Sequence, residues 1–365
     1  MPQPRIPGLE LPRLSVLIAA FNEERLIAGK LRNTLALNYP DDRLEVIVGS
    51  DGSTDATDEI VRNLARDDSR IRLVRSQSRI GYTGIHNLML ENSSGELLMI
   101  TDADISLAAN TATYLAAWFS NPAVGAAMAH LIRTDGQGSP AEGIFDRLEE
   151  RTRRLEGKMG ALVGTYAAAL MLRRALASPL PSDTILADFA IGIRPLLAGR
   201  AVVYEPRAKA YGMVETPALE LRRRIRIAAG SAQAFMRYAL PVLARRGPAA
   251  LALASHKLAR ALMPVLLVLI LIGSVLGCFS VGMTGTISKA LVLLLASSPL
   301  ALTVRPRLRR LLLVQYYVLA NAATLYGYVK YFLGQQRHIW QRTPRTGGGQ
   351  RITDTDQAEE AKGAA

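Results

Sequence analysis

Two carboxylates spaced two residues apart, Asp102 and Asp104, follow an apolar run over residues 97–101. Such a run predicts a buried strand, and acids at the end of a strand place hard oxygen ligands at the carboxyl edge of a sheet. Hard oxygens are the ligands that Mg²⁺ and Mn²⁺ prefer, and these ions in turn hold the phosphates of a substrate. The pair therefore predicts a metal site for a phosphate-bearing ligand, with an ordinary polar turn as the alternative.

The elements that must hold this pair alternate between strands and helices. Apolar, β-branched runs predict strands over residues 14–20, 44–48 and 71–74. Helices are predicted between them, and Asn22 can cap the first, with Glu23 and Glu24 in its first turn. This alternation is typical of an α/β fold with a doubly wound, mostly parallel sheet. Asp51 follows the second strand, so we expect it at the same sheet edge as Asp102.

Three motifs, at residues 15–24, 49–55 and 101–104, resemble family 2 glycosyltransferases with the GT-A fold, in the order and at the separation usual for that family. The resemblance covers roughly residues 12–230. It implies an inverting transfer from a nucleotide-sugar, most often a UDP-sugar. Carried over by position, it places Ala20, Phe21 and Glu23 around the nucleobase and ribose, Asp51 on the base or ribose, Asp102 beside the ribose or the metal, and Asp104 on the metal.

The second half of residues 12–230 resembles the acceptor-binding half of the domain in this family. Gly164 and Thr165 lie in a segment similar to the one that borders the acceptor and the donor sugar. Asp188 matches the second acid of a Glu-Asp or Asp-Asp pair, the catalytic base, while Ala187 replaces the first acid. An inverting transferase needs such a carboxylate to take the proton of the acceptor hydroxyl. The alternative is that Asp188 only caps the helix predicted over residues 189–198.

Other positions leave two interpretations open. Residues 79–87 resemble the glycine-containing segment that touches the donor, but Tyr82 stands where lysine is common. Residues 223–227 resemble the [Gln/Arg]-x-x-Arg-Trp motif of polysaccharide synthases, with Arg223 and Arg226 at its two basic positions and Ile227 in place of the tryptophan. One helical turn apart, both arginines can reach a diphosphate from one face, or they can bind anionic lipid on an interfacial helix. The helix over residues 145–158 is expected to present a solvated face.

The composition indicates a membrane protein. Hydrophobic residues make up 49% of 365, the net charge is +13, and the mean hydropathy is +0.15. The arginines flank apolar runs, and no basic groove with interleaved aromatic residues accompanies them, which excludes a nucleic-acid partner. A single cysteine, Cys278, excludes an intrachain disulfide and a cysteine-based metal site.

Apolar runs over residues 261–288, 290–304 and 311–329 predict two or three transmembrane helices. Four arginines between residues 305 and 310 place that loop in the cytoplasm. We therefore expect a multi-pass inner-membrane protein with a cytoplasmic catalytic domain. The expected parts are an extension without a signal sequence (1–12), a GT-A domain (13–216), basic interfacial helices (217–260), a membrane region (261–334) and a basic, then disordered, tail (335–365).

The expected function is transfer of a sugar to a lipid or glycan acceptor near the membrane, in making an extracellular or capsular polysaccharide. One alternative is a single-sugar transferase acting on polyprenyl phosphate or a glycolipid, which the missing tryptophan at Ile227 favours. Another is a non-catalytic subunit of a synthase complex, which the absent acid at Ala187 allows. Membrane lipids, and a synthase or export protein, are the expected partners.

Overall fold

The computed structural model describes residues 10–135, 144–213, 217–296 and 309–335. The chain divides into two compact units. Of the described residues, the first unit holds those up to 213 together with Arg245–Ala252, and the second holds residues 217–244 and those from 253 onward.

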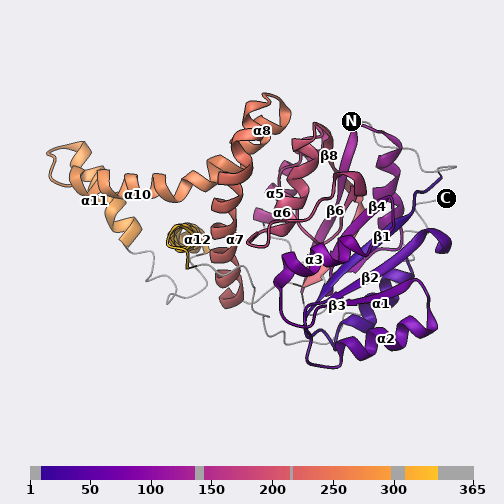
Figure 1. The fold of residues 1–365 in the computed structure, drawn as a ribbon. Coiled ribbons are helices and arrows are strands. Elements are labelled where there is room, and N and C mark those ends of the chain that lie inside the picture. The colour runs from indigo at the N-terminus through magenta and orange to yellow at the C-terminus, as the bar shows by residue number, and fades with distance from the viewer. Residues whose placement is uncertain (1–9, 136–143, 214–216, 297–308, 336–365) are drawn as a thin grey trace. The chain divides into compact units, whose positions relative to one another are not determined.

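The first unit is built around one mixed, mostly parallel sheet in the order β3-β2-β1-β4-β7-β6-β8-β5 (Figure 1). Strands β1 to β4 run parallel to one another, whereas β7 runs antiparallel to both β4 and β6. The predicted α/β fold is thus confirmed. The strands are β1 Leu14–Ala20, β2 Leu44–Ser50, β3 Ile71–Arg75, β4 Leu97–Asp102, β5 Ser106–Leu107, β6 Val124–Thr134, β7 Leu170–Arg173 and β8 Ala201–Met213.

Helices connect these strands and cover the sheet. All residues of β1 except Ala19 are buried, as expected for a central parallel strand, and Ile27 and Leu31 of α1 pack in the same core. The helices of this unit are α1 Ile27–Leu35, α2 Thr57–Asp67, α3 Gly81–Glu91, α4 Thr111–Ala116, α5 Ile144–Lys158, α6 Ala187–Leu197 and α9 Pro248–Ala252.

The loop after β1 differs from the expectation that Asn22 caps a helix. Asn22 has a φ of 55°, and its Oδ1 accepts a hydrogen bond from the Thr54 N–H at 2.8 Å. Glu24 Oε2 likewise accepts from the Ala56 N–H at 3.2 Å. These side chains hold the loop after β1 to the loop after β2, so α1 begins only at Ile27.

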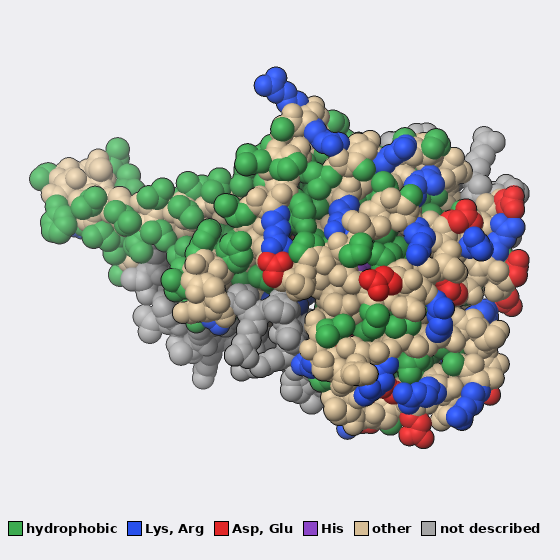
Figure 2. All heavy atoms as spheres, in the orientation of Figure 1, with side chains coloured by type: hydrophobic (Ala, Val, Ile, Leu, Met, Phe, Trp, Pro, Cys, Tyr) green, Lys and Arg blue, Asp and Glu red, His purple; other side chains and the backbone are tan. Residues whose placement is uncertain are grey.

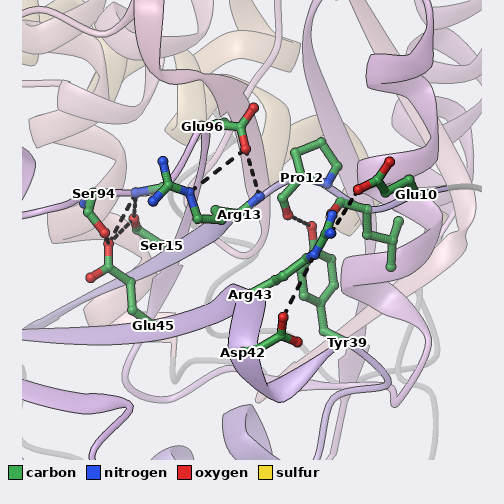
Figure 3. A network of polar contacts seen from close by, with 12 residues as sticks. Glu10, Pro12, Arg13, Ser15, Tyr39, Asp42, Arg43, Glu45, Ser94 and Glu96 are labelled. Atoms are coloured by element: carbon green, nitrogen blue, oxygen red, sulfur yellow. Dashed lines mark hydrogen bonds and ion pairs between the residues drawn. The ribbon is translucent and has the colours of Figure 1, made fainter.

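A polar network fixes the opposite, amino-terminal edge of the central strands (Figure 3). Glu45 of β2 accepts hydrogen bonds from the Ser94 N–H at 2.6 Å, the Gly95 N–H at 3.2 Å and the Ser15 hydroxyl. Burial alone would raise the pKa of Glu45, but these hydrogen bonds together lower it. The network anchors the starts of β1, β2 and β4 and thereby aligns their carboxyl ends.

The second unit is helical. Gly327 lets α12 approach α7 closely, because a Cβ there would lie 2.5 Å from the Ile225 carbonyl oxygen. Its helices are α7 Pro217–Ala234, α8 Leu240–Ala244, α10 Ala259–Gly277, α11 Met283–Ala296 and α12 Arg309–Phe332.

Helix α9, the π-helical stretch Leu253–Leu258 and α10 form one continuous helical run, Pro248–Gly277. Within the described part of the chain, this run is the one that is long and apolar enough to cross a membrane. Figure 2 shows hydrophobic side chains gathered over α10 and α11. The span expected over residues 261–288 is interrupted, since α10 ends at Gly277 and α11 begins at Met283. Gly282, with a φ of 83°, provides the turn between them. The expectation of two or three crossings stays a prediction.

Candidate functional site

The carboxyl ends of β1, β2 and β4 bring three predicted site residues to one edge. In the parallel register Ala20 pairs with Ser50, and Ala19 pairs with Asp102. The Asp51 N–H donates to the Ala20 carbonyl oxygen at 2.9 Å. Ala20, Asp51 and Asp102 therefore lie side by side, as the sequence predicted from strand order.

Asp51 holds the segment that opens α3. Its Oδ1 accepts hydrogen bonds from the Ile80 N–H at 2.7 Å and the Gly81 N–H at 3.1 Å, and the Arg79 Nε lies 3.7 Å from its Oδ2. Burial raises the pKa of the Asp51 carboxyl, against the opposing effect of these hydrogen bonds and of Arg79. A φ of 79° at Gly81 provides the turn that aims both N–H groups at the carboxylate.

Arg79 also covers the predicted nucleobase pocket. Its guanidinium carbon lies 3.7 Å from the centroid of the Phe21 ring, a distance at which a cation is attracted to an aromatic face. Glu23, which was predicted to line this pocket together with Ala20 and Phe21, is buried, and its N–H donates to Thr57 Oγ1 at 2.7 Å. A flat, cationic and aromatic surface of this kind suits a nucleobase and its phosphates.

The Asp102 and Asp104 side chains are half-buried in the turn that follows β4. The Asp102 N–H donates to the Ala167 carbonyl oxygen at 3.1 Å, and the Asp102 carbonyl accepts from the Ile105 N–H at 3.2 Å. The described residues contain no group of three or more His, Cys, Asp or Glu side chains placed to hold a metal. Two carboxylates completed by substrate phosphates and water are nonetheless the usual ligands of Mg²⁺, so this donor set fits the predicted ion.

Sequence reasoning missed Lys30, which lies in α1 beneath the carboxylate pair. Its side chain is buried, and its Nζ donates to Thr101 Oγ1 at 2.8 Å and to the Ile105 carbonyl at 2.7 Å. Burial lowers the pKa of Lys30 from 10.5 to about 7, although the charges of Asp102 and Asp104 act to raise it. A signal was available, because Lys30 falls on the helix face that carries Ile27 and Leu31.

We expect Lys30→Met to remove a pH dependence of stability. Above pH about 7 the folded amine is neutral while the unfolded chain still binds the proton, up to the ordinary pKa of 10.5. The free energy of unfolding therefore rises with pH in this window, by up to about 1.4 kcal/mol per pH unit. Unfolding midpoints of wild type and variant, measured at several pH values from 7 to 10, test this. Parallel pH profiles for the two proteins would contradict it.

The segment predicted to border the acceptor, around Gly164 and Thr165, forms hydrogen bonds with the end of β4 and with the backbone of Asp188. Thr101 Oγ1 donates to the Ala168 carbonyl at 2.7 Å, next to the buried Gly164 and Thr165. Thr165 Oγ1 donates to the Asp188 carbonyl at 3.0 Å. Helix α6 begins at Ala187 with Leu186 as its N-cap, so Asp188 lies inside the first turn and the alternative that it caps this helix is wrong. The Asp188 Oδ1 accepts a hydrogen bond from the Phe189 N–H at 2.8 Å.

The side chain of Tyr82 in α3 is influenced by both Asp102 and Asp188. Burial, and then the charges of Asp102 and Asp188, raise the pKa of the Tyr82 phenol well above its usual range. Both carboxylates thus act on one side chain of α3. The neighbouring His86 ring stacks on Tyr82 with centroids 6.5 Å apart, and burial lowers the pKa of His86 to about 4. His86 is therefore a neutral core residue near pH 7.

Arg223 and Arg226 lie in α7 of the second unit, where their side chains are half-buried and Ile227 is 36% exposed. Their predicted contact with a diphosphate stays a prediction.

Comparisons with known proteins agree with this arrangement. The model of glycosyl transferase family 2 matches residues 15–178. The chain is 31% identical over 162 residues to a beta-monoglucosyldiacylglycerol synthase of Nostoc sp., covering 42% of this chain and 35% of that protein. It is 26% identical over 239 residues to a poly-beta-1,6-N-acetyl-D-glucosamine synthase of Staphylococcus aureus, covering 62% and 57%. The chain thus spans about a third of the length of the first of these relatives.

A solved structure extends the likeness beyond the matched segment. It is the mannosyltransferase PcManGT from Pyrobaculum calidifontis in complex with GDP-Man and Mn²⁺, with a TM-score of 0.69 at 22% identity, covering 91% of this chain and 90% of that one. At this identity the likeness shows the fold. Together with the shared sheet edge, the two matches show a GT-A fold in which residues 15–178 belong to glycosyl transferase family 2.

Proposed function

We propose that this protein is an inverting glycosyltransferase that moves a sugar from a nucleotide-sugar to an acceptor near the membrane. The observation that carries the proposal is that Asp51 and Asp102 lie at one sheet edge, with Asp104 in the turn that follows β4. Asp188 is tied to the neighbouring segment by the hydrogen bond from Thr165 to its backbone carbonyl. Such an edge is where α/β sheets bind nucleotides. GDP-Man and Mn²⁺ in the similar mannosyltransferase support a nucleotide-sugar donor and a divalent ion.

The reaction needs one proton acceptor and a stabilised leaving group. In the proposed roles, the Asp188 carboxylate takes the proton of the acceptor hydroxyl as its oxygen bonds to the anomeric carbon. The bond between that carbon and the phosphate oxygen breaks with its electron pair moving to the diphosphate. Phe21, Glu23 and Asp51 bind the nucleoside, with Arg79 beside the phosphates. A divalent ion held by Asp102 and Asp104 would neutralise charge on the leaving diphosphate.

The proposed acceptor is a lipid or a glycan at the cytoplasmic face of the inner membrane. The helix Pro248–Gly277 supports membrane attachment, and one relative's name is that of a glycolipid synthase. We propose more than one crossing, with the catalytic unit in the cytoplasm. The described part of α11 has 14 residues, about 21 Å of helix, and so does not by itself span the hydrocarbon core of about 30 Å. The proposal of a second crossing rests on the apolar run of the sequence, which continues to residue 304.

A second candidate is the addition of a single sugar to a polyprenyl phosphate or a glycolipid. Ile227 stands where a polysaccharide synthase of the resembling branch has tryptophan, and the beta-monoglucosyldiacylglycerol synthase match points the same way. The length of the product separates the candidates, because a synthase yields a polymer and a single-sugar transferase yields one defined glycolipid.

The test is release of nucleoside diphosphate by the full-length, detergent-purified protein, across a panel of nucleotide-sugars with Mn²⁺ or Mg²⁺ and membrane lipid extract. We expect release from one donor, dependent on the metal. Binding of each nucleotide is measured in parallel by calorimetry. If no nucleotide binds, the non-catalytic alternative takes the place of the proposal.

We expect Gly192→Ala to lower turnover on the order of a hundredfold, the cost of misplacing a reacting group by about 1 Å. A Cβ at Gly192 would lie 2.0 Å from Thr165 Oγ1 and 2.5 Å from its Cγ2. Thr165 must then move, and its hydrogen bond to Asp188 is lost. The measurement is kcat for the donor identified above.

Gly29→Ala is the matched control, since a Cβ at Gly29 in α1 meets nothing within 4 Å. It should leave turnover unchanged. In a Thr165→Gly background, which removes the clashing atoms, Gly192→Ala should cause little further loss. An equal loss with and without Thr165 would show that the damage does not pass through this contact.

A further inference from the structure

Helix α5 exposes large apolar side chains on its outer face, and its role in connecting β6 to β7 does not explain them. The inner side packs on β8 (Figure 1), closely enough that a Cβ at Gly157 would lie 2.6 Å from the Tyr204 Cβ. On the opposite side Leu148 is 58% exposed, Leu155 55% and Met159 46%. At spacings of seven and four residues these side chains form one stripe along the helix. An ordinary solvated face would carry polar residues there.

The charged residues of α5 are sorted by sign. The acids turn toward the protein, where Glu149 pairs with Arg153 at 3.3 Å and the buried Glu156 accepts from the Val163 N–H at 3.2 Å. Glu150 pairs with Arg154, and Asp146 lies 3.9 Å from Arg133. The residues that remain exposed on the outer side are basic or apolar.

We propose that this outer face of α5 lies on the surface of an anionic membrane. The face consists of Arg147, Leu148, Arg151, Leu155, Lys158 and Met159. Apolar side chains flanked by arginine and lysine on a helix are the pattern of interfacial helices, whose apolar side enters the boundary between headgroups and acyl chains. The basic side chains attract anionic headgroups, and their long stems let the charge stay at the headgroup level.

The path of the chain supports a membrane as the occupant rather than a protein. Helix α9 belongs to the same unit as α5 and contacts it. Its Leu251 is 64% exposed. The same helical run, Pro248–Gly277, is the one that can cross a membrane. Helix α5, which carries the stripe, therefore lies beside the place where the chain enters that helical run.

Docking would also orient the catalytic unit. A φ of 68° at Gly160 ends α5 and turns the chain into the segment of Gly164 and Thr165, which contacts Asp188. If the proposed function holds, this contact places the acceptor side of the site next to the lipid. The docking itself needs no catalytic activity and can be tested without it.

The experiment places an environment-sensitive fluorophore on the full-length protein in lipid nanodiscs. The single cysteine is first replaced (Cys278→Ser), and a new one is introduced at Leu155→Cys or, as a control, at the exposed Glu59→Cys of α2. Helix α2 packs on β3, at the other end of the sheet from β8. In nanodiscs rich in phosphatidylglycerol we expect a blue-shifted, quencher-protected signal at residue 155, and an aqueous signal at residue 59.

Removing two arginines from α5 tests whether anionic headgroups contribute to the docking of this face. Arg147→Gln with Arg151→Gln should lower the ratio of protected to exposed label about 25-fold, fivefold for each arginine. Arg62→Gln with Arg66→Gln removes the same charge at the same spacing from α2 and should have no effect. An aqueous signal at residue 155 in anionic nanodiscs would overturn the proposal. Equal protection in detergent, in zwitterionic and in anionic nanodiscs would overturn it too, since protein would then cover the face.

Discussion

Asp188→Asn is expected to reduce sugar transfer by a factor on the order of 10² to 10⁴, the usual contribution of a general base. Asparagine has the same shape but does not take up a proton near neutral pH. Its side-chain oxygen can still accept the hydrogen bond from the Phe189 N–H, seen at 2.8 Å for Asp188. The start of α6 should therefore stay folded, and nucleotide binding should survive.

Asp183→Asn is the matched control for this variant. Asp183 lies five residues earlier on the same approach to α6 and is exposed, so its substitution should leave turnover near the wild-type value. Single-turnover transfer and calorimetric titration of nucleoside diphosphate measure the two properties separately. Near-normal transfer by Asp188→Asn would refute its role as base. Loss of nucleotide binding as well would indicate a structural role instead.

The sheet edge could be predicted because its signal is local. The central strands β1, β2 and β4 show as mostly apolar runs, and in parallel sheets the residues that follow such runs share an edge. Asp51 and Asp102 were placed together on that basis, and the register confirms their proximity. The family motifs added the fold, which the comparisons confirm.

Contacts between distant segments could not be predicted in this way. The link from Asn22 to Thr54 joins two loops, and local propensity favoured a helix cap at the same residue. The burial of Lys30 could be read from the helix face that it shares with Ile27 and Leu31, but its contacts with Thr101 and Ile105 join segments more than 70 residues apart. The interruption between α10 and α11 could not be predicted, because the uncharged run of the sequence continues through the turn after Gly277. The structure shows this turn through the end of α10 and the positive φ of Gly282.

Asp104→Asn is expected to weaken metal binding and to lower turnover at least about a hundredfold, because the charge on the leaving diphosphate loses its counter-ion. The Asp104 side chain is half-buried in the turn after β4, and the amide that replaces it is neutral and a poorer ligand for a hard cation. Asp102→Asn should act in the same direction. The proposed base and the contacts of Thr165 are untouched by either change.

Electron paramagnetic resonance of free Mn²⁺, titrated with protein and nucleoside diphosphate, reports this binding directly. Wild type should remove Mn²⁺ from solution when the diphosphate is present, and Asp104→Asn should require a much higher protein concentration. Asp67→Asn removes one exposed carboxylate from the end of α2 and should behave as wild type. Because Lys30 lies beneath the pair and responds to both charges, Lys30→Met should tighten Mn²⁺ binding at pH 6.5, where the buried amine is mostly protonated. Unchanged Mn²⁺ affinity in Asp104→Asn would mean that the carboxylate pair does not hold the ion, and the donor site would then have to bind its diphosphate through arginines alone.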